Sequence, residues 1–208
     1  VNLMDEIQKI KKISKTFSDF DKREFPSICF SLATGLGKTR LMGAFIAYLY
    51  YAKGIKNFFV MSPNLTIYNK LIRDFGDVNY SKYVFKGLDA FASAPRIVHG
   101  DNYEEFRQQV IGSNDITINV FNISKLNSES KGKVGQPPRI KRLNEVLGES
   151  YFQYLVELDD LVLLMDESHH YRADRGMTVI NELKPILGIE VTATPQVQKG
   201  SKAEKFNN

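Results

Sequence analysis

The chain has a single cysteine, Cys29, and no tryptophan among its 208 residues. One cysteine excludes an internal disulfide, and scarce cysteine is typical of a reducing compartment. No stretch reaches the roughly 18 consecutive apolar residues of a membrane-spanning helix, and no signal peptide is recognisable. We therefore predict a cytoplasmic protein without a membrane partner.

The overall composition permits a globular domain but does not assign a function. A hydrophobic content of 43% supports a core, and the length fits one large domain. The net charge of +4 is compatible with a nucleic-acid partner and equally with an ordinary protein surface. The chain starts at Val1 and not at Met, so we expect a segment of a longer polypeptide.

The most informative stretch is residues 32–40, Leu-Ala-Thr-Gly-Leu-Gly-Lys-Thr-Arg. It follows an apolar run at 28–32 and precedes helical spacing at 41–49, and this order of strand, Gly-Lys-Thr loop and helix is that of a phosphate-binding P-loop. Glycines let backbone N–H groups surround a phosphate, and the following helix presents its positive end to the anion. Lys38 can reach the β- and γ-phosphates, and the Thr39 hydroxyl can bind Mg²⁺.

The candidate ATP-binding residues of this loop are Thr34, Gly35, Leu36, Gly37, Lys38, Thr39 and Arg40. Leu32 stands where the general P-loop pattern has glycine, so the motif needs independent support.

A second motif supplies that support. The apolar run 161–165 ends in Asp166 and Glu167. Such a run is typical of a strand buried in a parallel sheet, and open α/β sheets bind ligands at the carboxyl ends of their strands. Asp166 is then a candidate Mg²⁺ ligand, and Glu167 a candidate to orient or deprotonate the attacking water. A solvated turn is the alternative for an isolated Asp-Glu pair, but the P-loop earlier in the chain favours the catalytic interpretation.

A third motif follows a predicted strand at 188–191 and reads Thr192-Ala193-Thr194-Pro195. Ala-Thr-Gly-Leu-Gly-Lys-Thr, Asp-Glu-Ser-His and Thr-Ala-Thr-Pro, in this order, resemble motifs I, II and III of superfamily 2 helicases and translocases. The residues around them resemble the restriction-subunit branch, which includes the motor subunits of type III and type I restriction enzymes. The resemblance spans about residues 25–197.

The resemblance implies an α/β P-loop NTPase with a RecA-like parallel sheet and helices on both faces. Residues 25–197 would form this ATP-binding domain, after a lead-in with a helix at 1–24 and before a polar tail at 198–208. Lys38, Asp166 and Glu167 would be catalytic, with Mg²⁺ held by Thr39 and Asp166. The implied cofactors are ATP and Mg²⁺.

The resemblance also implies residues that connect the ATP site to DNA. His169, Thr192 and Thr194 would couple motif II to motif III. Ser62, Pro63 and Asn64, with Asn122, would contact nucleic acid. A helix cap at Asn64 and a turn or cap at Asn122 are equally compatible with these sequences.

The implied function is ATP hydrolysis coupled to movement on double-stranded DNA, within a bacterial or archaeal restriction endonuclease. Its partners would be a second RecA-like domain of the same polypeptide, a nuclease domain, and modification or specificity subunits. We find no nuclease signature in these 208 residues. A stand-alone DNA or RNA helicase and a nucleotide-gated DNA-binding scaffold without productive hydrolysis remain as alternatives.

Strands alternate with helices along the rest of the chain, which predicts a parallel sheet. Further strands are expected at 57–62, 83–85, 96–99 and 115–121, and helices at 38–53, 65–75 and 149–158.

Overall fold

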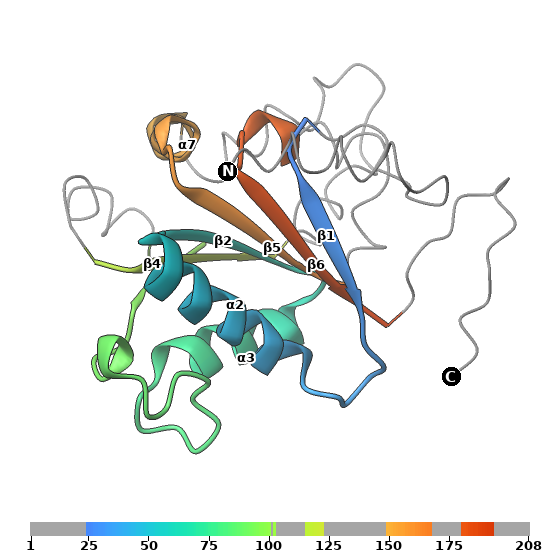
Figure 1. Ribbon diagram of the computed structural model, residues 1–208, viewed down its shortest axis with the longest axis vertical. Helices are drawn as coiled ribbons and strands as arrows, with labels where there is room; N and C mark the ends of the chain where they lie inside the picture. Colours follow the sequence, from blue (N-terminus) through green and yellow to red (C-terminus); the bar gives the residue numbers. More distant parts are fainter. Residues whose placement is uncertain (1–23, 101, 103–114, 123–148, 168–179, 194–208) are drawn as a thin grey trace, which may run out of the picture.

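The computed structural model describes residues 24–100, 102, 115–122, 149–167 and 180–193. They form a six-stranded sheet in which all paired strands are parallel. In spatial order the strands are β1 (Ser27–Ser31), β6 (Leu187–Thr192), β5 (Leu161–Asp166), β2 (Asn57–Ser62), β4 (Thr117–Asn122) and β3 (Arg96–His99). The sheet confirms the α/β fold expected from the sequence, and it places β6 and β5 between β1 and β2 (Figure 1).

Helices cover both faces of this sheet. α2 (Lys38–Lys53) and α3 (Leu65–Gly76) lie on one face, and α7 (Glu149–Glu157) lies on the other (Figure 1). None of the described helices is long and apolar enough to cross a membrane.

The central strands are apolar on both sides because both faces are covered. In β5, Val162 and Leu164 pack in the hydrophobic cluster of α2 and α3, whereas Leu163 and Met165 pack in the cluster of α7. All six residues of β5 are buried. Side chains of successive strand residues point to opposite faces, so a continuous apolar run is what a strand in this position requires.

The helix ends follow local signals in the sequence. α2 ends at Gly54, whose φ of 70° lies in the left-handed region that favours glycine, and its N–H returns to the last carbonyls of the helix. α3 begins after Asn64, whose side chain accepts a hydrogen bond from Ile67 N at 2.9 Å. Both helices therefore have the bounds expected from the sequence within one residue.

The strand expected at 83–85 is absent from the structure. Tyr83 and Phe85 are buried, but they pack in an aromatic cluster with Phe75 of α3 and with Phe91, and they do not pair with a strand. Their alternation therefore reflects burial in a folded turn, with Val84 N bonded to the Asp74 carbonyl at 3.0 Å.

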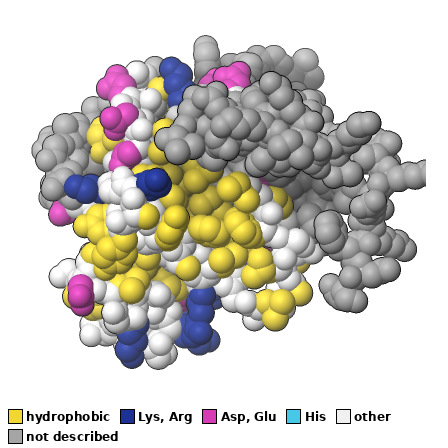
Figure 2. Space-filling view, in the orientation of Figure 1, with side chains coloured by type: hydrophobic (Ala, Val, Ile, Leu, Met, Phe, Trp, Pro, Cys, Tyr) yellow, Lys and Arg dark blue, Asp and Glu magenta, His cyan; other side chains and the backbone are white. Residues whose placement is uncertain are grey.

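Figure 2 shows hydrophobic side chains over much of the front face, with Lys and Arg at its lower edge.

Candidate nucleotide-binding site

The three predicted motifs meet at the carboxyl edge of the sheet. Ser31, the last residue of β1, pairs with Thr192, the last residue of β6. Asp166, the last residue of β5, pairs with Val191 of β6. Parallel strands end at the same edge, so the segments that follow β1, β5 and β6 start side by side.

Two glycines shape the loop after β1. Gly35 and Gly37 have φ values of 87° and 90°, in the region that side-chain-bearing residues rarely adopt. Leu36 N bonds back to the Ala33 carbonyl at 3.3 Å, which closes a turn. Thr34, Gly35, Leu36 and Arg40 are exposed, and Leu36 exposes 69% of its surface. The loop is therefore open to a ligand from solvent.

The first turn of α2 is suited to an anion. Gly37 is its N-cap and makes no side-chain cap, and no acidic residue stands in the first turn. The backbone N–H groups at a helix start lack partners within the helix and carry partial positive charge. Lys38, the first residue of α2, adds a full positive charge at the same place.

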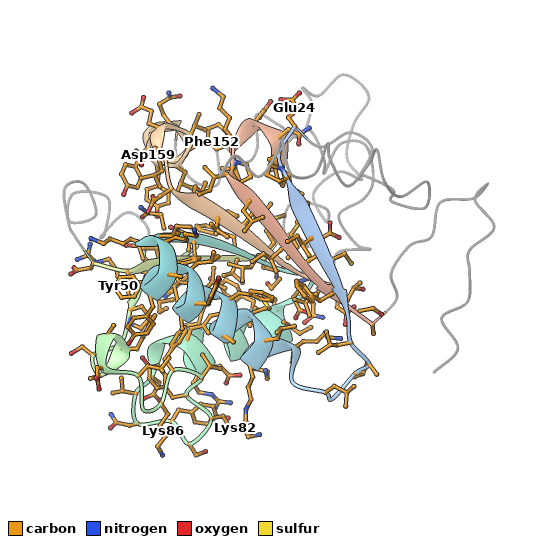
Figure 3. The ribbon with its side chains drawn as sticks, in the orientation of Figure 1. Glu24, Tyr50, Lys82, Lys86, Phe152 and Asp159 are labelled. Atoms are coloured by element: carbon orange, nitrogen blue, oxygen red, sulfur yellow. The ribbon has the colours of Figure 1, made fainter. Side chains whose placement is uncertain are left out.

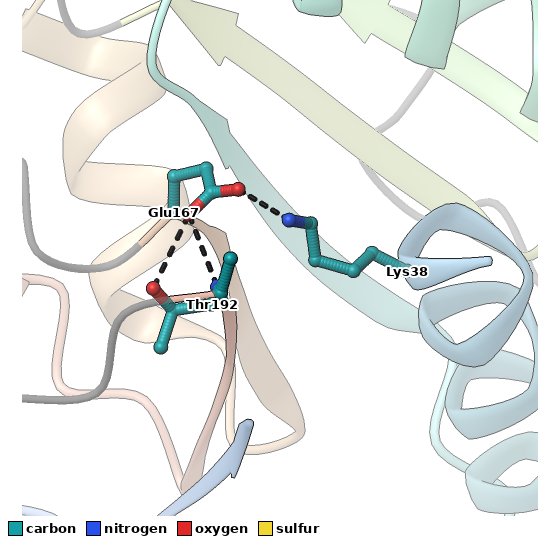
Figure 4. Close-up of polar contacts among 4 residues, drawn as sticks. Lys38, Glu167 and Thr192 are labelled. Atoms are coloured by element: carbon teal, nitrogen blue, oxygen red, sulfur yellow. Dashed lines mark hydrogen bonds and ion pairs between the residues drawn. The ribbon is translucent and has the colours of Figure 1, made fainter. Parts of the chain in front are cut away.

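Lys38 reaches the second motif. Its Nζ donates to Oε1 of Glu167, and these two side chains expose only 13% and 17% of their surface (Figure 4). The other carboxylate oxygen of Glu167 accepts from Thr192 Oγ1 at 3.2 Å and from Ala193 N at 3.4 Å. One residue from each of the three motifs thus takes part in a single hydrogen-bonded group.

The backbone of Glu167 is held in an uncommon conformation. Its φ is 51°, in the left-handed region, and its N–H donates to the Val191 carbonyl at 2.8 Å. Burial raises the pKa of the Glu167 carboxyl, but hydrogen bonds from Lys38 and Ala193 outweigh burial and hold that pKa below its usual range. The side chain is therefore ionised at neutral pH while Lys38 contacts it.

Asp166 has an unusual environment for a carboxylate. It is 5% exposed, and its Oδ1 is buried with no hydrogen-bond partner. Burial, followed by the neighbouring Glu167 charge, raises the pKa of Asp166 from 3.8 to about 6, against the opposing influence of Lys38 and Lys70. An unsatisfied buried carboxylate oxygen is costly, and binding a cation would remove that cost. Carboxylate oxygens are ligands that Mg²⁺ accepts, so the environment of Asp166 suits the predicted role of this residue as a metal ligand.

The sequence did not reveal a second lysine at this site. Lys70, on α3, donates from Nζ to Thr39 Oγ1 at 2.7 Å. It also forms an ion pair with Asp74, one helical turn further on, at 2.9 Å. The spacing of four residues between Lys70 and Asp74 is compatible with an ion pair within the helix, but nothing in the sequence places that pair against the P-loop.

Leu32 has a role in the structure that does not require glycine. Its N–H donates to the Thr192 carbonyl at 2.9 Å, which extends the pairing of β1 and β6 by one residue. Thr192 therefore holds the start of the P-loop through its backbone and Glu167 through its hydroxyl.

The residues predicted to contact nucleic acid differ in their exposure to solvent. Ser62 and Asn122 lie opposite each other at the ends of β2 and β4. Both are buried, and the Ser62 hydroxyl donates to the Phe121 carbonyl at 3.3 Å. The Ser62 side chain is 0% exposed and that of Asn122 7%, and the contacts of both residues with nucleic acid stay predictions. Asn64 is exposed, and its side chain caps α3.

Some predictions concern residues that the structure does not describe. His169 and Thr194 lie outside the described residues, as do residues 1–23 of the lead-in predicted at 1–24 and the tail at 198–208. Their predicted roles stay predictions.

The sheet and the site together define the class of protein. A parallel sheet covered by helices on both faces, with a glycine loop between β1 and α2 and carboxylates at the end of β5, is an α/β P-loop NTPase fold of the RecA-like type. Within this class, the chain belongs to the family of the type III restriction enzyme res subunit, whose model matches residues 4–197.

One curated relative agrees with this family. A probable type III restriction-modification enzyme HindVIP Res subunit of Haemophilus influenzae is 27% identical over an alignment of 177 residues, which covers 78% of this chain and 30% of that protein. The chain thus spans about a third of the length of the curated relative it matches.

Two solved structures are similar in fold. One is a nuclease-deletion mutant of the type ISP restriction-modification enzyme LlaGI with a DNA substrate mimic, at a TM-score of 0.51 and 14% identity, covering 84% of this chain and 16% of the other. The second is a Sulfolobus solfataricus SWI2/SNF2 ATPase core with double-stranded DNA, at a TM-score of 0.48 and 15% identity, covering 92% and 31%.

Proposed function

We propose that residues 25–197 form the ATP-binding half of a DNA translocase motor in a restriction endonuclease. Family membership supports a motor of the restriction type. The observation that carries the proposal is the hydrogen-bonded group of Lys38, Glu167 and Thr192, which joins the three motifs at one edge of the sheet.

Each residue of the group has a proposed role in binding or proton transfer. The P-loop backbone from Thr34 to Arg40 surrounds the phosphates, and Lys38 leaves Glu167 to contact them. Thr39 and Asp166 would hold Mg²⁺, which neutralises phosphate charge when bound. Glu167, released from Lys38, orients a water and accepts its proton.

The departure of Lys38 makes Glu167 a better base. The hydrogen bond from Lys38 is the largest influence that lowers the pKa of Glu167, and burial acts in the opposite direction. Removing that bond leaves burial less opposed, so the pKa of the carboxyl rises and the carboxylate becomes a stronger base. The same lysine thus suppresses the base before nucleotide binds and releases it afterwards.

Thr192 is proposed to connect this site to DNA. It contacts Glu167 through its hydroxyl and the P-loop through its backbone, so a change at the phosphates displaces both contacts. His169 and Thr194 are proposed to act with it. The proposed nucleic-acid contacts at the surface are Pro63 and Asn64, at the start of α3.

The full activity is proposed to need other parts of a longer polypeptide. A second RecA-like domain would complete the ATP cleft and supply an arginine finger, which contributes about 10³–10⁵ in rate to phosphoryl transfer. Cleavage of DNA would require a nuclease domain outside these residues, and target selection would require modification or specificity subunits.

Two measurements test this proposal. We expect the 208-residue chain to bind a fluorescent ATP analogue weakly and in a Mg²⁺-dependent manner, with very slow turnover. The full-length polypeptide should show ATPase activity that double-stranded DNA stimulates. Strong DNA-stimulated ATPase activity from the 208-residue chain would contradict the need for a second domain. Failure of the full-length polypeptide to hydrolyse ATP would favour the scaffold alternative.

A further inference from the structure

Lys70 connects the two helices that follow β1 and β2. Its Nζ donates to Thr39 Oγ1 at 2.7 Å, in the first turn of α2. The same Nζ lies 2.9 Å from Asp74 Oδ2, one turn further along α3. An ammonium group has three hydrogens to donate, so it makes both contacts at once.

Asp74 has a second oxygen that can receive this charge. The Asp74 side chain is 4% exposed, and its Oδ1 is buried with no hydrogen-bond partner. A buried oxygen without a donor is unfavourable, so a shift of the ammonium further onto Asp74 would satisfy it. Lys70 keeps 46% of its side chain exposed, which leaves room for a change of rotamer.

Thr39 Oγ1 is an atom that two cations would share. The proposed function assigns this hydroxyl to Mg²⁺, and the present inference rests on that assignment. An ammonium and a divalent ion at one oxygen repel each other. Because Lys70 also reaches Asp74, it has a nearby anion to move to when the metal binds.

We propose that Lys70 is a positioning residue with two alternative places. Before Mg²⁺-nucleotide binds, it holds the Thr39 hydroxyl and links α2 to α3. When Mg²⁺-nucleotide binds, Lys70 leaves Thr39 and pairs with both oxygens of Asp74. α3 begins immediately after Asn64, which is one of the proposed nucleic-acid contacts. The exchange therefore changes how α3 is connected to the P-loop.

The experiment measures metal dependence and not turnover. The measured quantity is the Mg²⁺ concentration that gives half of the metal-dependent change in fluorescence. It is measured on the full-length polypeptide with a fluorescent ATP analogue at saturating concentration. Lys70→Met removes the competitor for Thr39, so this concentration should fall about two- to fivefold, as expected for the loss of a partly exposed charge contact. Asp74→Asn removes the receiving anion, so the concentration should rise.

Opposite shifts distinguish the proposal from a structural role of the ion pair. A pair that only stabilises α3 would move both variants in the same direction. Lys70→Met removes the cation that pairs with the buried Asp74 carboxylate. Where this single variant does not fold, the double variant Lys70→Met/Asp74→Asn replaces it. The half-maximal Mg²⁺ concentration of the double variant should also be lower than that of the wild type.

Two controls complete the design. Lys86→Met removes a positive charge from the exposed loop after α3, at the lower edge of the view in Figure 3, and should leave the Mg²⁺ dependence unchanged. In a Thr39→Val background, Lys70→Met should no longer shift the Mg²⁺ dependence. A midpoint for Lys70→Met at or above that of the wild type, or a downward shift for Asp74→Asn, overturns the inference. A wild-type protein that binds no nucleotide at any Mg²⁺ concentration overturns the proposed function as well.

Discussion

Lys38 and Glu167, 129 positions apart in the chain, are joined by a hydrogen-bonded ion pair between Nζ and Oε1. A lysine that binds phosphate has to leave this carboxylate. In the proposed function, nucleotide binding therefore exchanges an internal ion pair for a contact with the ligand, and it changes the charge environment of the proposed base in the same step.

Lys38→Ala should weaken nucleotide binding. The lost contact is a hydrogen bond to a charged group, which typically contributes about 1.5–3 kcal/mol, and every 1.4 kcal/mol corresponds to about tenfold in affinity. We expect an affinity about 10- to 100-fold lower in equilibrium titrations with a fluorescent ATP analogue. Lys53→Ala, in the exposed last turn of the same helix, is the matched control and should bind normally.

Glu167→Gln should separate binding from hydrolysis. The amide has nearly the same shape but does not accept a proton from water. ATP turnover by the full-length polypeptide should fall by about 10²- to 10⁴-fold, the usual contribution of a general base. Nucleotide affinity should not fall, because the ion pair that competes with the phosphates for Lys38 is weakened. Unchanged turnover in this variant would remove Glu167 from the catalytic residues.

Thr192→Val should uncouple DNA from hydrolysis. Valine matches the shape of this fully buried threonine but lacks the hydroxyl that donates to Glu167. The backbone contact with Leu32 remains, so nucleotide binding should persist. We expect the stimulation of ATPase activity by DNA to fall by about tenfold, as for loss of one hydrogen bond to a charged group. Thr192→Ser retains the hydroxyl and should retain most of the stimulation; equal loss in both variants would contradict a role for this hydroxyl.

Tyr83 should make the free energy of unfolding of this protein depend on pH in the alkaline range. Burial raises the pKa of Tyr83 from 10.0 to about 12, and its hydroxyl donates to the Phe91 carbonyl at 3.0 Å. The folded protein keeps this phenol protonated where the unfolded chain ionises it. Its contribution to the free energy of unfolding is therefore complete below pH 10 and is lost as the pH rises from 10 through about 12.

The Tyr83→Phe variant tests this dependence. At neutral pH it should lose about 1 kcal/mol with the hydrogen bond. Between pH 10 and pH 12 its stability should fall less steeply than that of the wild type, as measured by urea unfolding at each pH. Parallel curves for the two proteins would mean that the Tyr83 phenol does not supply the difference.

The loop at 32–40 was predictable because its requirements are local. Gly35 and Gly37 adopt positive φ, and the helix that follows starts at Lys38, so contiguous residues specify the turn and the anion-binding helix start. The buried strand that ends at Asp166 was predictable for a related reason, since a run of apolar residues at 161–165 suits only a strand covered on both faces.

The strand expected at 83–85 shows the limit of this reasoning. Alternating burial of Tyr83 and Phe85 satisfied the pattern of a strand, but their partners are aromatic rings from α3 and from the turn near Phe91. The surroundings of Ser62 were not predictable either. The sequence located Ser62 at the end of a strand, but its burial and the hydrogen bond of its hydroxyl to the Phe121 carbonyl depend on the neighbouring strand β4.

The sequence by itself determined the P-loop, the carboxylates of motif II, and the alternation of strands and helices, because each depends on residues close together in the chain. Only the tertiary structure decided the strand order, in which β6 and β5 separate β1 from β2. That order brings Thr192 against both Leu32 and Glu167, and the packing of α2 beside α3 brings Lys70 to Thr39. These contacts depend on how whole elements are oriented in space, and the energies that orient them come from the many apolar contacts of two cores and not from any short motif.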